Sequence, residues 1–152
     1  MKNICAVLTI LLIFLGTDVE AQEWIRYTKD CCNLKSNNIT SVVIDSSGGK
    51  WFGTDNGLMH FDGTNWTNYQ KTTDGNSIPS NQINDLAMES SLTAGERIWI
   101  ATDNGAVVVD SIFGELIYDT TYQEVNSDLL SNNVMTIFID NNNVKWFGTD
   151  KV

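Results

Sequence analysis

The sequence predicts an all-β protein assembled from a repeated unit of four short antiparallel strands. Three observations lead to this prediction. Two linked motifs recur three times, turn-forming residues separate short apolar segments, and 152 residues include 5 Trp but a single Pro. Aromatic and β-branched residues favour strands, whereas Asn, Asp and Gly favour the tight turns between them. The apolar fraction of 42% indicates a packed globular core.

The first repeated motif is a Ser-Asn sequence that leads into an apolar strand. It begins at Ser36, Ser80 and Ser131, and the strands that follow end in an acid, at residues 39–45, 83–89 and 134–140. The same three positions are apolar in each strand: Ile39, Val42 and Ile44; Ile83, Leu86 and Met88; Val134, Ile137 and Ile139. These strands are therefore expected to hold one equivalent place in every unit.

The second motif follows each of these strands and reads Trp, apolar residue, small residue, Thr. Its copies are residues 51–54, 99–102 and 146–149, and their Trp residues lie 48 and 47 positions apart. A short turn rich in Gly or Asn joins the two motifs, and residues 90–96 lengthen this hairpin in the second copy. Chance rarely produces two linked motifs with one period, so the chain contains an internal repeat.

Two further strands complete each predicted unit. Thr-Asp-Asn-Gly turns lead into third strands at residues 58–62 and 106–110, and fourth strands follow at 65–69 and 115–119. Four antiparallel strands in ~40–50 residues correspond to one blade of a β-propeller. Because each blade packs against two neighbours, its strands are apolar on both faces. The predicted fold is an incomplete β-propeller of about two and two-thirds blades.

The N-terminal residues have the pattern of a secretory signal peptide. Lys2, the apolar residues 4–16 and a small residue at Ala21 predict a cleaved leader spanning residues 1–21. The alternative is an uncleaved anchor, but a bilayer span requires roughly 20 apolar residues. The mature chain is therefore expected to be exported, to the periplasm or the extracellular space, and to contain no membrane span.

Residues 22–152 are expected to form the partial propeller. Residues 22–35 form an outer strand and a loop, residues 36–79 blade 1, residues 80–130 blade 2 and residues 131–152 the start of blade 3. The outer strand is inferred because Glu23 to Tyr27 parallels the fourth strand of blade 1. The loop contains Cys31 and Cys32, which remain thiols or form a strained disulfide between adjacent residues.

The chain resembles the two-component regulator propeller repeat, which reads Leu-Pro-Ser-Asn-x-Val, a strand ending in Asp, Gly-x-Leu-Trp-Phe-Gly-Thr and Asn-Gly-Leu. The matching segments are residues 78–83, 45–54 and 56–58, and the resemblance covers residues 23–152. It implies an extracytoplasmic propeller like those that sense carbohydrate-related ligands for hybrid histidine kinases, or a related secreted propeller. No phosphoacceptor segment or ATP-binding domain follows the repeats, so any kinase activity would reside in sequence not present.

Residues that recur at equivalent positions are expected to stabilise the blades. They are Asp45, Trp51, Gly53, Thr54, Gly57, Glu89, Trp99, Thr102, Gly105, Asp140, Trp146, Gly148 and Thr149. One acid at a fixed place in every unit indicates a structural hydrogen bond, because the paired carboxylates of a glycosidase would break the repeat. The repeated Trp residues could stack on sugars, but their recurrence favours packing between blades.

Residues that depart from the repeat or gather oxygen atoms are the candidates for catalytic and metal sites. His60 is the only histidine and stands where the second copy has Val108, which predicts a packed side chain without a catalytic triad. Residues 62–65 and 140–143 offer oxygen ligands for calcium, but Asn and Asp are equally typical of turns. We therefore expect no cofactor and no metal.

Recognition is expected from loops at one end of the propeller. The candidates are the variable connections at residues 30–35, 72–78 and 120–128 and the Thr-Asp-Asn-Gly turns. A formal net charge of −10 argues against nucleic-acid binding, which requires a basic face. The expected partner is a carbohydrate-related ligand or another protein, and an open blade edge would also permit self-association.

The expected function is non-enzymatic recognition outside the cytoplasm. The chain would be the N-terminal sensor portion of a two-component regulatory protein, and ending within the third unit it would be a fragment of that protein. Two alternatives remain open at this point. One is a secreted propeller enzyme, a hydrolase or lyase acting on glycans, and the other is a non-functional truncated remnant.

Overall fold

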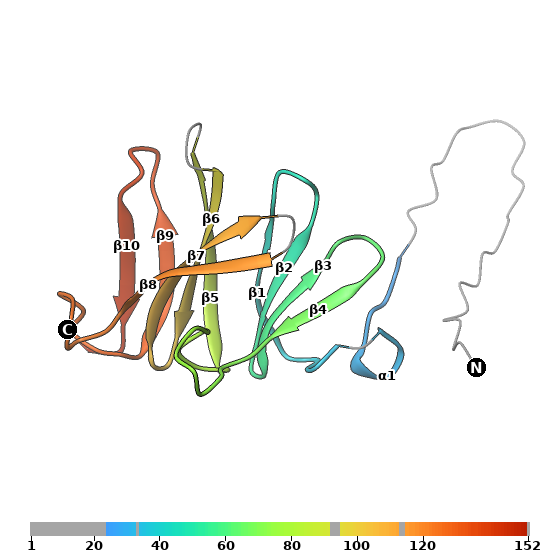
Figure 1. Cartoon of the computed structure of the whole chain (residues 1–152), viewed down its shortest axis with the longest axis horizontal. Helices are drawn as coiled ribbons and strands as arrows, with labels where there is room; N and C mark the ends of the chain where they lie inside the picture. The colour runs from blue at the N-terminus through green and yellow to red at the C-terminus, as the bar shows by residue number, and fades with distance from the viewer. Residues whose placement is uncertain (1–23, 33, 92–94, 113–114, 152) are drawn as a thin grey trace, which may run out of the picture.

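The computed structural model describes residues 24–32, 34–91, 95–112 and 115–151, and these form one short helix and ten strands (Figure 1). The elements are α1 (Lys29–Cys32), β1 (Ile39–Ile44), β2 (Lys50–Thr54), β3 (Gly57–Phe61), β4 (Trp66–Tyr69), β5 (Ile83–Ser91), β6 (Gly95–Thr102), β7 (Gly105–Ile112), β8 (Glu115–Tyr122), β9 (Val134–Ile139) and β10 (Lys145–Thr149). The predicted leader at residues 1–21 lies outside the described residues.

The strands form three antiparallel sheets that follow the repeat. Their strand orders are β1-β2-β3-β4, β5-β6-β7-β8 and β10-β9, and we name these sheets blade 1, blade 2 and blade 3. The sheets lie side by side in chain order, with the first strands β1, β5 and β9 in contact (Figure 1). This arrangement confirms the predicted all-β fold of four-stranded propeller blades.

A β-bulge recurs at the start of every blade. The ladder between the first two strands shifts register between Ile39 and Ser41 in blade 1, and at the equivalent place in blades 2 and 3. The extra residue in blade 2 is Asn84, whose Nδ2 donates to the carbonyl of Val134 in blade 3 at 2.8 Å. The bulge therefore frees a side chain that joins one blade to the next.

The hydrophobic core lies between the blades. One cluster joins blades 1 and 2 and includes Trp51, Leu58, Ile83 and Val107, all between 0 and 1% exposed. A second cluster joins blades 2 and 3 and includes Trp99, Val108, Val134 and Ile137. Every residue of β3 is buried, since this strand is covered on both faces. Packing between blades thus accounts for the missing apolar–polar alternation.

The inserted residues of blade 2 extend its hairpin instead of forming a separate loop. β5 continues to Ser91 and β6 begins at Gly95, with Ser90 paired to Glu96 in a continuous ladder. Each added ladder pair satisfies the backbone groups of two more residues, so the insertion lengthens the hairpin formed by β5 and β6.

The segment before blade 1 differs from the prediction of an outer strand and a loop. Residues 24–28 are not a strand, and the two cysteines lie in helix α1. A strand requires a ladder partner, and no described strand pairs with this segment. Instead the ring of Tyr27 packs 5.3 Å from that of Phe61 and 5.5 Å from that of Trp66. The segment is therefore attached by side-chain packing.

Candidate binding site

The repeated acid and the repeated Trp form one hydrogen bond in every blade. The indole Nε1 of Trp51 donates to Asp45 Oδ2 at 3.0 Å, that of Trp99 to Glu89 Oε2 at 2.6 Å and that of Trp146 to Asp140 Oδ2 at 3.0 Å. Each bond joins the end of the first strand to the start of the second. The acids therefore complete the blade framework.

Asp45 shows how fully such an acid is engaged. Its Oδ1 accepts the backbone N–H of Ser47 at 3.0 Å and that of Gly49 at 2.8 Å, and also the Ser47 hydroxyl. Burial by itself would raise the pKa of Asp45, but these hydrogen bonds and the one from Trp51 outweigh it and lower the pKa below its ordinary value. Asp45 is consequently ionised at neutral pH.

His60 lies beside this acid in the interior of blade 1. Its ring stacks on Trp51 with centroids 4.1 Å apart, and its Nε2 lies 3.7 Å from Asp45 Oδ2. Burial lowers the pKa of His60, although the charges of Asp45 and Asp62 act in the opposite direction. The residue is buried, at 6% exposure. This His–Asp contact is thus part of the core.

Glu89 connects two blades because its side chain is one methylene longer than Asp. Its Oε1 accepts Lys145 Nζ at 2.7 Å and Asn143 Nδ2 at 2.9 Å, both from the hairpin of blade 3. Burial would raise the pKa of Glu89, but these bonds, the Trp99 indole and the Lys145 charge lower it. The Lys145 ammonium also lies 5.6 Å above the Trp99 ring.

The small residues and Thr residues of the second motif shape the turns. The hydroxyls of Thr54 and Thr102 each donate to the carbonyl of a turn glycine, Gly57 or Gly105, at 2.7 Å. Thr149 instead donates to the Lys151 carbonyl at 2.9 Å.

Gly53 and Gly148 stand where the first two strands approach each other closely. A Cβ on Gly53 would lie 2.6 Å from Ser41 Oγ, and one on Gly148 would lie 2.7 Å from a methyl of Thr136. A larger residue at either position would therefore force the strands apart.

The turns and the variable connections meet at one end of the blades. Gln70 Nε2 donates to the Asn56 carbonyl at 3.2 Å, and Gln123 Nε2 donates to the Asn104 carbonyl at 2.9 Å. The glycine N–H of each turn then donates to an Asn carbonyl of the following blade, from Gly57 to Asn81 at 2.7 Å. These bonds fix the two Thr-Asp-Asn-Gly turns against the following blades.

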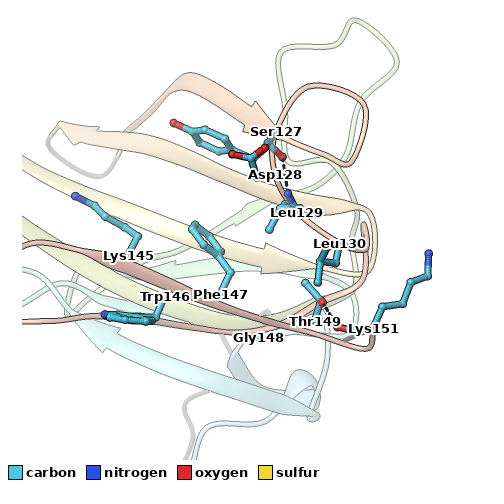
Figure 2. A pocket seen from close by; sticks show the side chains of 11 residues that line it. Ser127, Asp128, Leu129, Leu130, Lys145, Trp146, Phe147, Gly148, Thr149 and Lys151 are labelled. Carbon is cyan, nitrogen blue, oxygen red and sulfur yellow. Dashed lines mark hydrogen bonds between the residues drawn. The ribbon is translucent and has the colours of Figure 1, made fainter.

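A cavity of about 600 Å³ opens beside the connection from blade 2 to blade 3 (Figure 2). Its lining residues come from the end of β8, from the connection itself and from β10: Tyr122, Ser127, Asp128, Leu129, Leu130, Lys145, Trp146, Phe147, Gly148, Thr149 and Lys151. Figure 2 shows Phe147 and Trp146 on opposite sides of β10. Residues 127 and 128 of the wall belong to the predicted connection at 120–128.

The cavity combines aromatic rings with a few polar groups. The Trp99 ring stacks on Tyr122 at 5.5 Å and meets Phe147 edge-on at 5.7 Å, so that Trp99 supports two lining side chains. Ser127 Oγ donates to the Gln123 carbonyl at 2.6 Å, which fixes the shape of the connection. Such a combination of apolar surface and few polar groups is typical of small-molecule sites.

The two oxygen-rich segments considered for calcium act as turns. Asp62 Oδ1 accepts the backbone N–H groups of Thr64 at 2.7 Å and Asn65 at 2.6 Å. Asp140 Oδ1 accepts those of Asn142 at 2.8 Å and Val144 at 3.0 Å. In the described part of the chain, no three His, Cys, Asp or Glu side chains gather as a metal site would require.

Sequence reasoning placed residues 120–128 among the recognition loops but did not identify Lys145 and Phe147 as residues that line a cavity. Lys145 stands where the other copies have Lys50 and Ile98, so the residue type alone gave no signal for a role in a cavity. Tyr122 and Tyr69 hold equivalent places near the ends of fourth strands. An aromatic residue repeated there could have been recognised as packing, but its role in a cavity depends on the neighbouring blade.

Comparisons with known proteins support the fold and a distant relationship. No family model matches the chain, and no curated protein matches it. One solved structure is described as the extracellular domain of a hybrid two-component system, BT3049 of B. thetaiotaomicron. It superposes on this chain with a TM-score of 0.65 and 26% sequence identity. That match covers 81% of this chain and 17% of the other.

A second solved structure shares the fold alone. It is PorZ, an essential surface component of the type-IX secretion system of Porphyromonas gingivalis, with a TM-score of 0.53, 18% identity and coverage of 74% of this chain and 16% of that one. The chain therefore spans about a sixth of each of these proteins, which are an extracellular domain and a surface component. Within the described residues, no helix has the length and apolarity needed to cross a membrane.

Proposed function

We propose that this chain is a recognition module of an extracytoplasmic regulatory protein, the sensor portion of a two-component system, and that it binds a ligand without transforming it. The observation that carries the proposal is the 26% identity to the BT3049 extracellular domain over 81% of the chain. In a protein of this kind, ligand binding outside the membrane would shift the equilibrium between two domain arrangements.

The cavity beside blade 3 is the surface we assign to recognition. Phe147 and Tyr122 offer ring surface, while Ser127 and Asp128 offer hydrogen-bonding groups at its rim. Flat rings beside hydroxyl and carboxylate groups suit an uncharged, hydroxyl-rich ligand, such as a carbohydrate. The net charge of −10 also disfavours anionic ligands, because like charges repel.

Recognition without catalysis is favoured by the way the repeated acids are used. Asp45 and Glu89 each hold a Trp indole, and both are buried. A glycosidase needs two carboxylates free to reach opposite sides of one glycosidic bond. Acids committed to the blade framework would not meet this requirement, so we propose that the chain has no glycan hydrolase or lyase activity.

The test measures binding and turnover on the same exported full chain. Neutral oligosaccharides are screened by thermal shift and confirmed by calorimetry, and the same mixtures are analysed for cleaved products. We expect one saccharide class to bind and to remain intact. Cleavage of the bound saccharide would replace recognition with catalysis, and failure of every saccharide to bind would contradict the assignment of the cavity.

Two exposed apolar residues supply a matched pair of variants. Leu130 lines the cavity and is 61% exposed, whereas Val125 is 88% exposed and is not part of the lining. Leu130→Arg places a long charged side chain at the cavity and is expected to weaken binding at least about tenfold, a change of about 1.4 kcal/mol. Val125→Arg adds the same charge nearby and is expected to bind normally.

A further inference from the structure

The Asn of the Ser-Asn motif closes the connection that leads into each blade. In all three copies its side-chain Oδ1 accepts the backbone N–H of a residue near the start of that connection, and we call this contact the base hydrogen bond. The donor and acceptor pairs are Lys29 and Asn37 at 2.9 Å, Lys71 and Asn81 at 2.7 Å, and Glu124 and Asn132 at 2.8 Å. The three connections are therefore loops fastened at their base.

The connection from blade 2 to blade 3 has a second hydrogen bond at its base. The backbone N–H of Asn132 donates to Glu124 Oε1 at 3.0 Å, in the direction opposite to the base hydrogen bond. Lys29 and Lys71 stand in the place of Glu124, two residues after a Tyr, in the other two connections. An ammonium group donates hydrogen bonds and cannot accept them, so neither Lys can form this second bond.

The second bond attaches the start of the connection to a residue that is already anchored. The carbonyl of Asn132 accepts the N–H of Gly105, in the turn of blade 2, at 2.5 Å, and the N–H of Val134, in β9, at 3.1 Å. Hydrogen bonds to a carboxylate are stronger than those between neutral groups. Glu124 therefore fixes the connection to the blade framework more firmly than a Lys would.

The loop closed by this pair forms one wall of the cavity. Ser127, Asp128, Leu129 and Leu130 line the cavity, and all four lie between Glu124 and Asn132 (Figure 2). Inside the loop, the hydrogen bonds of Asn126 and Ser127 join residues at most five positions apart. Such local bonds shape the first turn of the loop, whereas its return to blade 3 depends on the contacts between Glu124 and Asn132.

From this geometry we propose that Glu124 is a positioning residue for recognition, because its carboxylate holds the connection in the shape that forms the cavity wall. Glu124 does not belong to the lining, so it acts through the connection. The proposal rests on the proposed function for the existence of a ligand. Without the second bond the loop would adopt further conformations, and the apparent Kd rises in inverse proportion to the fraction that is competent to bind.

Two variants of Glu124 separate its hydrogen bond from its charge. Glu124→Ala removes the acceptor, whereas Glu124→Gln removes the charge and keeps an oxygen for the N–H of Asn132. Both lose the ion pair of Glu124 with Lys151 at 3.3 Å, so the difference between them isolates the hydrogen bond.

Hydrogen exchange of the full chain without ligand measures how firmly the loop is held. We expect the backbone N–H groups from Glu124 to Asn132 to exchange at least about tenfold faster in Glu124→Ala, with exchange in the strands of blade 2 unchanged. Glu124→Gln is expected to exchange like the unmodified chain. Equal exchange of the loop in all three chains would overturn the proposal, and so would faster exchange of the blade strands in Glu124→Ala, since that result would assign Glu124 to general stability.

Calorimetry with neutral hexasaccharides of glucose, xylose and mannose measures the consequence for binding. The saccharide that binds the unmodified chain is expected to bind Glu124→Ala at least about tenfold more weakly and Glu124→Gln about equally. Unchanged affinity in Glu124→Ala, or an equal loss in both variants, would overturn the positioning role. If none of these saccharides binds the unmodified chain, the proposed function fails, and the exchange measurement alone decides whether Glu124 holds the loop.

Discussion

Removing the acid of blade 1 is the sharpest test of the blade framework. Asp45→Ala takes away the acceptor of the Trp51 indole and of the Gly49 backbone N–H. Trp51 is fully buried and Gly49 is buried as well, so both donors lose their acceptor away from bulk solvent. The variant therefore leaves two donors unpaired in the interior of the protein.

The size of the effect follows from burial. An unsatisfied buried donor costs about 1–3 kcal/mol, so that two donors give about 2–6 kcal/mol for Asp45→Ala. The same substitution in blade 3 exposes its donors to water, because Trp146 is 60% exposed. There only the net value of two hydrogen bonds is lost, about 1–3 kcal/mol. We expect Asp45→Ala to exceed Asp140→Ala by about 2 kcal/mol.

The assay is urea unfolding followed by far-ultraviolet circular dichroism. Both substitutions are made in the otherwise unmodified chain, in which Trp146 is exposed to water. Asp45→Asn serves as an intermediate variant. It retains one oxygen for Ser47 and Gly49 but offers the indole of Trp51 no charged acceptor, so we expect a smaller loss than for Asp45→Ala.

Equal losses of unfolding free energy in Asp45→Ala and Asp140→Ala would refute the reasoning. Such a result would mean that burial of the indole does not decide the strength of this contact. A larger loss in Asp140→Ala would refute it even more directly, since its donors can bind water.

Two further predictions concern His60 and the turn glycines. Burial lowers the pKa of His60, so below its ordinary value of 6.5 the unfolded chain takes up a proton first and the folded state loses stability. Val stands at this place in the second repeat, and His60→Val is expected to remove this pH dependence. The free energy of unfolding is measured in urea at pH 7.5 and 5.5. An equal loss at the lower pH in both chains would contradict the prediction. Gly57 and Gly63 both have positive φ, but they differ in the space around them. A Cβ added to Gly57 would lie 2.5 Å from the backbone carbonyl of Tyr69, whereas one added to Gly63 would meet no atom within 4 Å. Gly57→Ala is therefore expected to lose at least about 1 kcal/mol more than Gly63→Ala in the same assay, and equal losses would exclude a steric role.

The blades could be predicted from the sequence because each repeated residue has a local partner. Asp45 and Trp51 are six residues apart and meet across one hairpin, so their relationship is the same wherever the motif occurs. The strands β1, β5 and β9 begin where the Ser-Asn motif places them. Three copies of one pattern supplied the information that an alignment of homologues would otherwise provide.

The contacts between blades could not be predicted in the same way. Lys145 and Glu89 are separated by 56 residues, and the acid of the second copy is Glu where the other two copies have Asp. The cavity depends on this junction, because Phe147 of one blade approaches Trp99 of another. The outer strand predicted for Glu23 to Tyr27 is not formed at residues 24–27, since strand pairing depends on a neighbouring strand that sequence similarity to Trp66 and Tyr69 does not provide.

The contact between Lys145 and Glu89 offers a route by which ligand binding would be transmitted. Lys145 lines the cavity and also holds Glu89, the one repeated acid that reaches the following blade. A ligand that hydrogen-bonds to Lys145 would compete with Glu89 for the same ammonium group. Its affinity would then differ between two arrangements of blades 2 and 3, and such a difference is the requirement for a ligand to shift a conformational equilibrium. The framework acids Asp45 and Asp140 make no such link, so a signal carried by this route would begin at Glu89.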